Sequence, residues 1–535
     1  MPDTSPRRTP PRPLRKRVRW LVWAVLLVII GYQLWSHRFG VPEDFADAGA
    51  HFKYGSIGAD HPLARAPLPY WIWKVLPEVF PPSEVMPKAL APRNTLKSFA
   101  AFGLVSETAM ERPVGMPDGQ AALERPIGFS KRNVFGLDFV GMNCAFCHTT
   151  TLRKAPDQPP DIILGGTGNS VDIERYFLFM FAAFDSPRFN GDVVMDAVLK
   201  EARHQNQPLN LAERLLYRYV FIPVIPRVVG QMKVEDFDFI TLHSPTRLPN
   251  FGPGRVDTWS LYKRQFVDPP QRDKIPGIVD FPAIWNQKAR IGMRMHWDGN
   301  TDVLEERNIV SALALIGSRL DYLDYPRLTR ISDWTVGLLP PRYQDRIPDQ
   351  FLPDGKQSIR QALASRGETL FRSHCANCHA ADGIRVGRVE PNDDLATDGN
   401  RIKDFTPELA DALDELGTEV WKLRNFRPQN GYVNNLLDGI WLRSPYLHNG
   451  SVPTLRDLLN APENRPKKFC RGDDLYDWKN VGFVSTLQAG QGAAACGTFF
   501  VYDTSIPGNR NVGHVYGTAL ADDDKEALLE FLKTL

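Results

Sequence analysis

The clearest hydrophobic periodicity lies in the last third of the chain. Over residues 522–535 the apolar side chains fall at i, i+3, i+4 and i+7, which predicts a helix with one buried face; they are Leu528, Phe531, Leu532 and Leu535. Carboxylates at the start of this segment favour a helix N-terminus. A second amphipathic helix is predicted over residues 358–371, with Ser358 as its N-cap.

An uncharged apolar run of sixteen residues, WLVWAVLLVIIGYQLW from Trp20 to Trp35, predicts a membrane anchor. As a helix it would span about 24 Å, somewhat less than the ~30 Å hydrocarbon core. Seven Lys or Arg residues precede it within residues 7–19, so the positive-inside rule predicts a cytoplasmic N-terminus. The alternative, a cleaved signal peptide, lacks a small-x-small cleavage site. We therefore expect a single-pass protein of the bacterial inner membrane with a periplasmic body.

The rest of the chain divides by composition. Residues 39–125 are rich in proline and aromatic residues and have no clear helical period, which predicts an N-terminal arm packed on a first domain. The proline-rich stretch 338–353 is typical of a linker. The predicted organisation is a basic tail with the anchor (1–38), the arm (39–125), an N-terminal domain (126–337), a linker (338–357) and a C-terminal domain (358–535).

The charge balance excludes one class of function. The 64 Lys and Arg residues nearly balance the 62 Asp and Glu residues, which gives a net charge of +2. A nucleic-acid-binding protein normally presents a basic face. No such cluster follows the first twenty residues, so we expect no nucleic-acid partner.

Two short motifs carry the chemistry: CAFCH at residues 144–148 and CANCH at residues 375–379. Cys-x-x-Cys-His is the attachment signal for c-type haem, in which both thiols bond to the haem and the histidine ligates iron. A zinc knuckle would need further Cys or His nearby, and a thioredoxin-like pair needs no histidine. The motifs predict two covalent haems, held by Cys144, Cys147, His148, Cys375, Cys378 and His379.

Cys470 and Cys496 remain outside these motifs. In an oxidising compartment two spare cysteines usually pair, so we expect a disulfide, with two buried thiols as the alternative. Helix, haem motif, long loops and closing helix is the plan of a small cytochrome c domain. We therefore predict a mainly α fold with two such domains and the transmembrane helix.

A weak internal repeat supports a duplication. Trp297-Asp298-Gly299 follows the first motif and is followed by Leu304, and His448-Asn449-Gly450 stands at the same offset from Leu455 after the second. An Ile-Trp pair precedes each of the two triplets. Asx-Gly steps also recur by chance, so this evidence depends on the two haem motifs before it.

Several segments resemble the bacterial dihaem cytochrome c peroxidase superfamily, namely HWDGNTDVLEE (296–306) and SPYLHNGSVPTLRDLL (444–459). The similarity is greater to its rubber-oxygenase-like branch, which shares PIGFSKR before a haem motif, Glu-Arg-Asn (306–308) and Gly-His-x-Tyr-Gly-Thr (513–518). The resemblance covers residues 125–535. It implies two all-α cytochrome c domains face to face, one with a reactive haem and the other an electron relay.

The resemblance also implies residue roles. Trp297 matches the tryptophan between the two haems, and the distal glutamate of the peroxidases falls on Gly317. A distal side without this acid–base suits oxygen or an apolar substrate better than peroxide. Gly317→Glu is then expected to favour the peroxide reaction. The predicted distal face consists of Ala312, Leu313 and Leu315, each of which can equally be plain helix core.

Three further histidines are candidates near the haems. His514 stands just before the closing helix, where small cytochromes c place the sixth ligand, and His448 is its competitor. The resemblance favours His448 as a residue that lines the haem without ligating it. His296 precedes Trp297 and is a candidate contact of a propionate.

The sequence thus predicts a dihaem oxidoreductase that is more oxygenase-like than peroxidase-like. The alternatives are a cytochrome c peroxidase that reduces hydrogen peroxide and a pure electron-transfer cytochrome. The expected partners are the cytoplasmic membrane, a periplasmic electron donor or acceptor, and a small substrate such as O2, H2O2 or an apolar organic molecule. A structural Ca2+ between the domains stays open, without a motif to support it.

Overall fold

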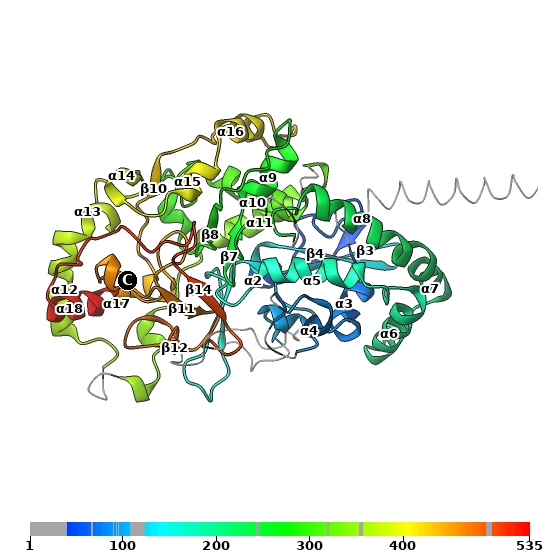
Figure 1. The fold of residues 1–535 in the computed structure, drawn as a ribbon, viewed down its shortest axis with the longest axis horizontal. Helices are drawn as coiled ribbons and strands as arrows, with labels where there is room; N and C mark the ends of the chain where they lie inside the picture. Colours follow the sequence, from blue (N-terminus) through cyan, green and yellow to red (C-terminus); the bar gives the residue numbers. More distant parts are fainter. Residues whose placement is uncertain are drawn as a thin grey trace, which may run out of the picture.

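The computed structural model describes residues 40–535 except 66–67, 89, 93, 95, 108–122, 242–243, 245–246, 318–319, 353–356 and 488–494. Helices make up 40% and strands 12% of the structure. The prediction of a mainly α fold is therefore wrong. The protein is a mixed α/β structure of short elements joined by long loops (Figure 1).

The predicted membrane topology is corrected as well. Within the described part of residues 40–535, no helix is long and apolar enough to cross a membrane. This finding conflicts with the inner-membrane, single-pass protein that the sequence led us to expect. The run from Trp20 to Trp35 itself lies outside the described residues.

A four-stranded antiparallel sheet, in the order β1-β3-β4-β2, lies in the N-terminal half. Its centre is a hairpin whose two-residue turn, Phe135-Gly136, has positive φ angles of 63° and 80°. Such turns usually carry Asn-Gly or Asp-Gly, so the phenylalanine concealed this hairpin in the sequence. The strands are β1 (Val41–Pro42), β2 (Leu68–Pro69), β3 (Phe129–Val134) and β4 (Leu137–Met142).

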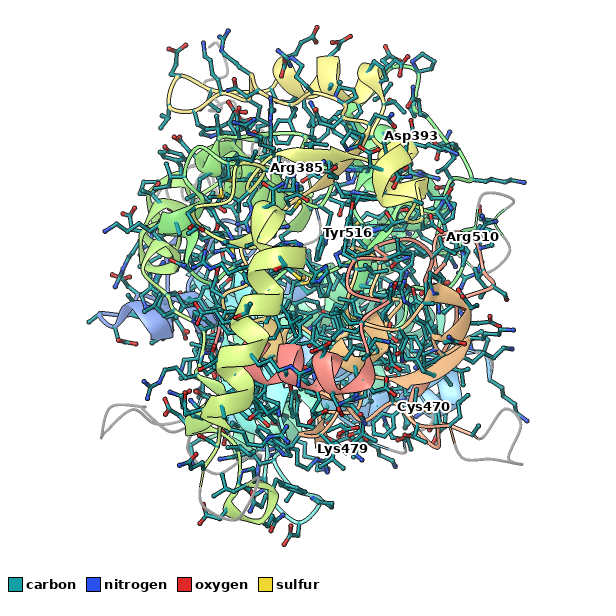
Figure 2. The ribbon with its side chains drawn as sticks, turned by 90° about the vertical axis from the view of Figure 1, so that its left-hand side faces the viewer. Arg385, Asp393, Cys470, Lys479, Arg510 and Tyr516 are labelled. Carbon is teal, nitrogen blue, oxygen red and sulfur yellow. A yellow bond between two sulfur atoms is a disulfide. The ribbon has the colours of Figure 1, made fainter. Side chains whose placement is uncertain are left out.

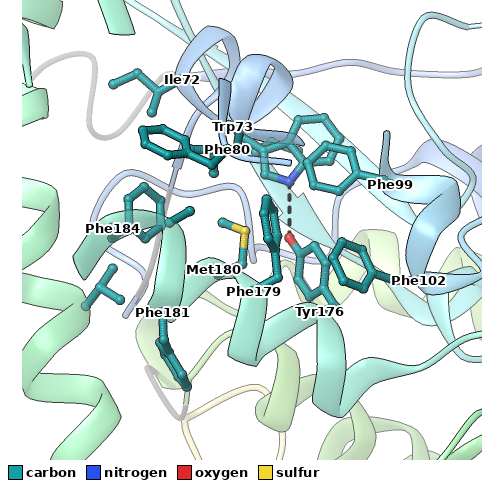
Figure 3. Close-up of a cluster of buried hydrophobic side chains, with 14 of the residues drawn as sticks. Ile72, Trp73, Phe80, Phe99, Phe102, Tyr176, Phe179, Met180, Phe181 and Phe184 are labelled. Atoms are coloured by element: carbon teal, nitrogen blue, oxygen red, sulfur yellow. Dashed lines mark hydrogen bonds between the residues drawn. The ribbon is translucent and has the colours of Figure 1, made fainter. Parts of the chain in front are cut away.

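The predicted N-terminal arm contains helices that belong to the core. In α3 (Tyr70–Val79) almost every side chain is buried, so the sequence shows no alternation of apolar and polar positions. Trp73 stacks on Phe99, and its indole N–H donates to the Tyr176 hydroxyl at 3.1 Å (Figure 3). The other elements of this region are α2 (Ala48–Tyr54), α4 (Pro82–Val85) and η1 (Phe99–Phe102).

Helices pack around this sheet and its aromatic core. α3 contacts β4 and α6, and α5 contacts α8 (Figure 1). A π-helical turn, η4, joins α7 to α8 in one continuous run. The elements are α5 (Ile173–Asp185), α6 (Gly191–His204), α7 (Leu211–Leu216), η4 (Tyr217–Phe221) and α8 (Ile222–Glu235).

The middle of the chain supplies short hairpins and three helices. β5 pairs with β6, and β7 pairs with β8. The elements are β5 (Thr149–Leu152), β6 (Asp161–Leu164), β7 (Arg255–Asp257), α9 (Trp259–Phe266), β8 (Ile278–Asp280), η5 (Gln287–Arg290), α10 (Leu304–Leu315), η6 (Leu320–Tyr322) and α11 (Tyr325–Val336).

The two predicted C-terminal helices are present. α12 (Gln361–His374) begins three residues later than predicted, since the backbone N–H of Arg360 donates to Glu530 and Ser358 is no cap. α18 (Asp522–Leu532) begins as predicted, and the two helices cross (Figure 2). Between them lie α13 (Ala376–His379), β9 (Val389–Pro391), α14 (Asn392–Leu395), α15 (Asn400–Asp404), α16 (Pro407–Asp414), β10 (Gly431–Val433), η10 (Ile440–Leu442), α17 (Leu455–Leu458), β11 (Lys468–Arg471), β12 (Tyr476–Asp477), β13 (Gly482–Phe483) and β14 (Phe500–Asp503).

The expected disulfide is present. Cys470 on β11 is bonded to Cys496, with 5.3 Å between their Cα atoms. Cys470 is labelled in Figure 2, below the crossing of α12 and α18. The bond closes a loop that carries β12 and β13 onto the C-terminal core.

The internal repeat has a structural counterpart. Met295 bridges Thr301 and Tyr446 bridges Val452, so in both repeats a turn of five residues is closed by one antiparallel bridge. His296 and Leu447, at equivalent positions, both have left-handed φ angles, of 62° and 67°. A helix follows at the same offset in each copy, α10 in the first and α17 in the second.

The hydrophobic core consists of three clusters of buried side chains. One cluster joins the arm to the N-terminal helices, and a second joins α9 and α10 to residues 405–426. The third surrounds α12 and α18 and includes Tyr343 and Ile347 from the predicted linker. The second and third clusters each contain residues from segments that we assigned to different domains. The predicted domain boundaries therefore stay a prediction.

The crossing of α12 and α18 depends on a glycine. A Cβ atom on Gly367 would overlap the carbonyl oxygen of Ala527, so we expect Gly367→Ala to lower the free energy of unfolding by about 1–3 kcal/mol. Gly230 in α8 is the matched control, because no described atom lies within 4 Å of its added Cβ. Gly230→Ala should raise stability by up to about 1 kcal/mol. Denaturant unfolding measures both, and an unchanged Gly367→Ala variant contradicts the close crossing.

Candidate functional site

The second motif opens into a cavity of about 430 Å³, which we call the C-terminal cavity. Cys375 ends α12 and His379 ends the short helix α13, so both side chains and Cys378 face the same space. Leu528 and Leu532, from the apolar face of α18, line its wall. Arg385 and Tyr516, labelled in Figure 2, also belong to the lining.

His379 and His514 face one another across this cavity. Their ring centres are 6.3 Å apart. A bond between a metal ion and an imidazole nitrogen is about 2 Å long, and the ring centre lies roughly 1 Å further back. Two rings that bind one ion from opposite sides therefore have centres roughly 6 Å apart. The pair fits the two axial ligands of a single haem iron.

Neighbouring groups hold the two imidazoles in these positions. Nδ1 of His379 lies 2.7 Å from the carbonyl oxygen of Asn435, which leaves Nε2 free for iron. The loop of His514 is fixed by Arg465, which donates to the carbonyls of Gly513 and His514 at 2.8 and 3.0 Å. Burial lowers the pKa of His379 and lowers that of His514 to about 4, so both rings are neutral, as ligation requires.

His448 lines the C-terminal cavity but has another partner. Its ring stacks on Tyr432 with centres 4.0 Å apart, and its Nε2 lies 3.0 Å from the Tyr432 hydroxyl. Burial lowers the pKa of His448 to about 3. The side chain is therefore a neutral part of the cavity wall, engaged by a tyrosine.

The first motif opens into a smaller N-terminal cavity of about 200 Å³. Cys144 lies in η3 (Cys144–Phe146), and Cys147 and His148 follow it directly. Burial lowers the pKa of His148 to about 3, which leaves a neutral imidazole. Among the described residues that line this cavity, the only other imidazole is that of His296, whose Nδ1 lies 2.7 Å from Asn300 Oδ1.

Helix α10 supplies one wall of the N-terminal cavity. Of the three residues predicted for the distal face, Leu315 lines the cavity, whereas Ala312 and Leu313 are fully buried in the core of α9, α10 and residues 405–426. The helical period explains the difference, because positions 310, 311, 314 and 315 share one face. The residues of α10 that line the cavity are Arg307, Val310, Ser311, Ala314 and Leu315.

An apolar side cavity of about 100 Å³ adjoins the N-terminal cavity. The two share the side chains of Met142, Phe177, Phe237, Leu261, Ala314 and Leu315. Gly317 lines the side cavity and not the N-terminal one. It has a φ of 62°, and an added Cβ would overlap the side chain of Arg65. Gly317→Glu is therefore no test of distal acid–base chemistry.

One wall separates the two main cavities. The residues that line both are Asp280, Phe281, Pro282, His296, Trp297 and Arg307. Trp297 is among them, and its indole N–H donates to the carbonyl of Asp280 at 2.8 Å. The wall thus provides an aromatic side chain in contact with both cavities.

The residues present fit a haem in each cavity. Arg401 is buried, lies over the ring of Trp259 and lines the N-terminal cavity. Asp298 lies 3.5 Å from its guanidinium, but Nε and Nη1 form no hydrogen bond with the described residues. A haem propionate is the kind of carboxylate that satisfies such a cation. In the C-terminal cavity, Nε of Arg443 is likewise without a partner in the described chain.

The structural Ca2+ that the sequence analysis left open, without a motif, gains no support from the structure. Over the described residues, no group of three or more His, Cys, Asp or Glu side chains is arranged to hold a metal ion.

The residues that sequence analysis missed come from segments far apart, such as Phe177, Phe237 and Arg401. Such residues carry no local motif, and only the fold brings them together.

The two candidate sixth ligands make different predictions. His514→Ala removes the ring that faces His379, so the C-terminal haem should change from low-spin to high-spin. His448→Ala, the matched control from the same cavity, should leave that haem low-spin. Electron paramagnetic resonance of both variants measures this, and the reverse pattern contradicts the assignment.

Comparison with known proteins also points to a cytochrome in this region. A family described as RoxA-like, cytochrome c-like matches residues 431–470, a segment that includes Tyr432 and His448. Two proteins of Sinorhizobium fredii (strain NBRC 101917 / NGR234) are similar to the chain. Uncharacterized protein y4iM is 31% identical over 46% of this chain and 59% of its own length. Uncharacterized protein y4iJ is 40% identical over 37% of this chain and 42% of its own length.

The chain spans about half the length of the curated relatives it matches. The family match supports the rubber-oxygenase-like branch of c-type cytochromes, and a cytochrome c-like domain implies covalently bound haem iron. The resemblance to the wider dihaem peroxidase superfamily stays a prediction. The C-terminal region is thus similar to a RoxA-like cytochrome c.

Proposed function

We propose that the protein is a dihaem c-type cytochrome oxidoreductase with a reactive N-terminal haem and an electron-relay C-terminal haem. The observation that carries this proposal is the difference between the two cavities. The C-terminal cavity has a pair of imidazoles 6.3 Å apart, whereas α10 presents no imidazole to the N-terminal cavity and lines it with Arg307, Ser311 and three apolar side chains. A haem closed by two imidazoles suits electron transfer, and an open position suits a reaction.

The side chains have separate tasks in this proposal. When bound, the haems supply one-electron chemistry and an iron site for a small oxidant. His379 and His514 hold the relay haem, and Trp297 provides an aromatic contact between the cavities. Arg401 binds a propionate of the N-terminal haem. Leu315, Ala314 and the phenylalanines of the side cavity exclude water and accept an apolar substrate.

The apolar face favours oxygen chemistry over peroxide reduction. Heterolysis of peroxide needs a group that moves a proton between the two oxygens, and such assistance contributes about 10²- to 10⁴-fold. On the α10 face, Val310, Ala314 and Leu315 cannot move a proton, Ser311 has the one hydroxyl, and Arg307 does not lose its proton. The carboxylates of this cavity belong to other elements; they are Glu174, Asp257 and Asp280. The preferred reaction is therefore oxygen-dependent oxidation of an apolar, unsaturated molecule such as a lipid or an isoprenoid.

A substitution at Leu315 tests this choice of oxidant. Leu315→Glu places a carboxylate of similar size in the N-terminal cavity, so it should raise peroxide reduction at least about tenfold and lower oxygen uptake with an unsaturated lipid. Leu315→Gln is the matched control, since glutamine has the same shape as glutamate but no carboxyl group that can gain or lose a proton. Stopped-flow oxidation of a reduced cytochrome donor and an oxygen electrode provide the two rates.

The outcomes distinguish the candidate functions. Efficient peroxide reduction by the unmodified protein would favour the peroxidase alternative. No reaction with either oxidant, together with two six-coordinate haems, would favour a pure electron-transfer cytochrome. Oxygen uptake that falls in Leu315→Glu but not in Leu315→Gln supports the oxygenase.

A further inference from the structure

A buried lysine surrounded by carboxylates lies behind the N-terminal cavity. Lys263 on α9 is inaccessible to solvent, and its ammonium group donates to Asp273 at 2.7 Å and to the carbonyl of Asp404 at 3.0 Å. It also donates to the carboxylate of Asp404 at the end of α15. Three carboxylates and the lysine form what we call the acid–lysine chain: Asp273, Lys263, Asp404 and Asp257.

Gly277 brings the two innermost carboxylates together. Its backbone N–H donates to Asp257 Oδ2 at 3.0 Å, while a Cβ atom at the same residue would overlap Asp404 Oδ2. Asp404 Oδ2 is buried and has no hydrogen-bond donor among the described groups. A buried carboxylate oxygen without a donor, beside a second carboxylate, is best explained by a proton on one of the two acids.

The charges around this pair agree with a shared proton. Asp404 faces Lys263 from α9, Asp257 from β7 and Arg401 from its own helix. Burial and the neighbouring Asp257 raise the pKa of Asp404 to about 8, although Lys263 and Arg401 lower it. Burial also raises the pKa of Asp257. The two acids therefore titrate together near neutral pH.

The acid–lysine chain leads from the surface to the N-terminal cavity. At its outer end the side chain of Asp273 is 28% exposed, and at its inner end Asp257 lines the cavity. Although burial alone lowers the pKa of Lys263, Asp404 and Asp273 raise it overall. Transfer through the lysine is therefore concerted: an N–H proton moves to Asp404 as a proton from Asp273 replaces it.

Two other buried acids line the same cavity but have no such connection. Glu174 is held by Arg247 at 3.0 Å and by the N–H of Phe251 at 2.6 Å. Asp280 is held by Arg471 at 2.8 Å. Arginine does not lose its proton in proteins and cannot relay one, whereas lysine can.

We infer that the acid–lysine chain delivers a proton to the Asp257–Asp404 pair when the N-terminal haem is reduced. This inference rests on the proposed function, which supplies the haem and its electron donor. The donor's electron converts ferric to ferrous iron, and a proton from water enters at Asp273 and remains on the pair. Both leave again on reoxidation, so the buried charge near the haem stays constant.

The reduction potential of the N-terminal haem, followed in the loaded protein through its high-spin optical bands, tests this inference. In the unmodified protein the potential should fall as pH rises through neutrality, because proton uptake favours the reduced state. Asp404→Asn keeps the shape and the Lys263–Asp273 pair, and should abolish this dependence. Redox-induced infrared difference spectra should show a protonated-carboxyl band that Asp404→Asn removes.

Three further variants make the test decisive. Asp257→Asn should also abolish the pH dependence, and it replaces Asp404→Asn if that variant does not fold. Asp273→Asn should leave the equilibrium dependence but slow proton uptake at least tenfold after rapid reduction. Glu174→Gln tests the competing acid of the same cavity, because burial raises the pKa of Glu174 to about 7; this variant should keep both the pH dependence and the rate of proton uptake. A potential that does not depend on pH, or a dependence lost in Glu174→Gln but kept in Asp404→Asn and Asp257→Asn, overturns the inference. Absence of the high-spin haem itself would instead refute the proposed function.

Discussion

The arrangement of the two cavities depends on the contacts of Asp280. Its carbonyl accepts the indole N–H of Trp297 at 2.8 Å, and its backbone N–H donates to the carbonyl of His448 at 2.9 Å. Its buried carboxylate meets Arg471 at 2.8 Å, on the strand that also carries the disulfide. One residue thus joins the two equivalent turns of the repeat and strand β11. The carboxylate of Asp280 also lies 3.8 Å from Arg255, so loss of Asp280 would deprive two buried arginines of their shared partner, at a cost of about 3–5 kcal/mol.

The two copies of the repeat differ where their functions are expected to differ. After the first turn, α10 (Leu304–Leu315) is long enough to present an apolar face to the N-terminal cavity. After the second turn, α17 (Leu455–Leu458) has only four residues, and the chain continues to the loop of His514. A helix wall in one copy and a ligand-bearing loop in the other would make one haem open and the other closed. The same ancestral plan can therefore supply a reaction site and an electron relay.

Features determined by short motifs were predictable from the sequence. A few specific residues determine each of three such features, namely the two Cys-x-x-Cys-His motifs, the apolar face of α18 and the pairing of Cys470 with Cys496. The strands were not predictable, because a Phe-Gly turn and strands of two to six residues give little periodic signal. In α3 the exposed face is reduced to two polar residues, Lys74 and Glu78, which give only a weak helical signal in the sequence.

The distal wall shows a second limit of sequence analysis. Leu315 lines the N-terminal cavity, whereas Ala312 and Leu313 lie on the other side of α10, because residues two positions apart point in nearly opposite directions on a helix. Arg401, Phe237 and the acid–lysine chain reach the N-terminal cavity from distant segments. Their roles follow from long-range packing, which no local pattern records.

The central claim is that one chain holds one open haem and one haem closed by two imidazoles. An electron paramagnetic resonance spectrum of the purified, oxidised protein, with the haem content per chain measured on the same sample, tests it most directly. The account predicts two covalent haems, with one high-spin and one low-spin ferric signal of equal intensity. Two low-spin signals, or a single haem per chain, would contradict it.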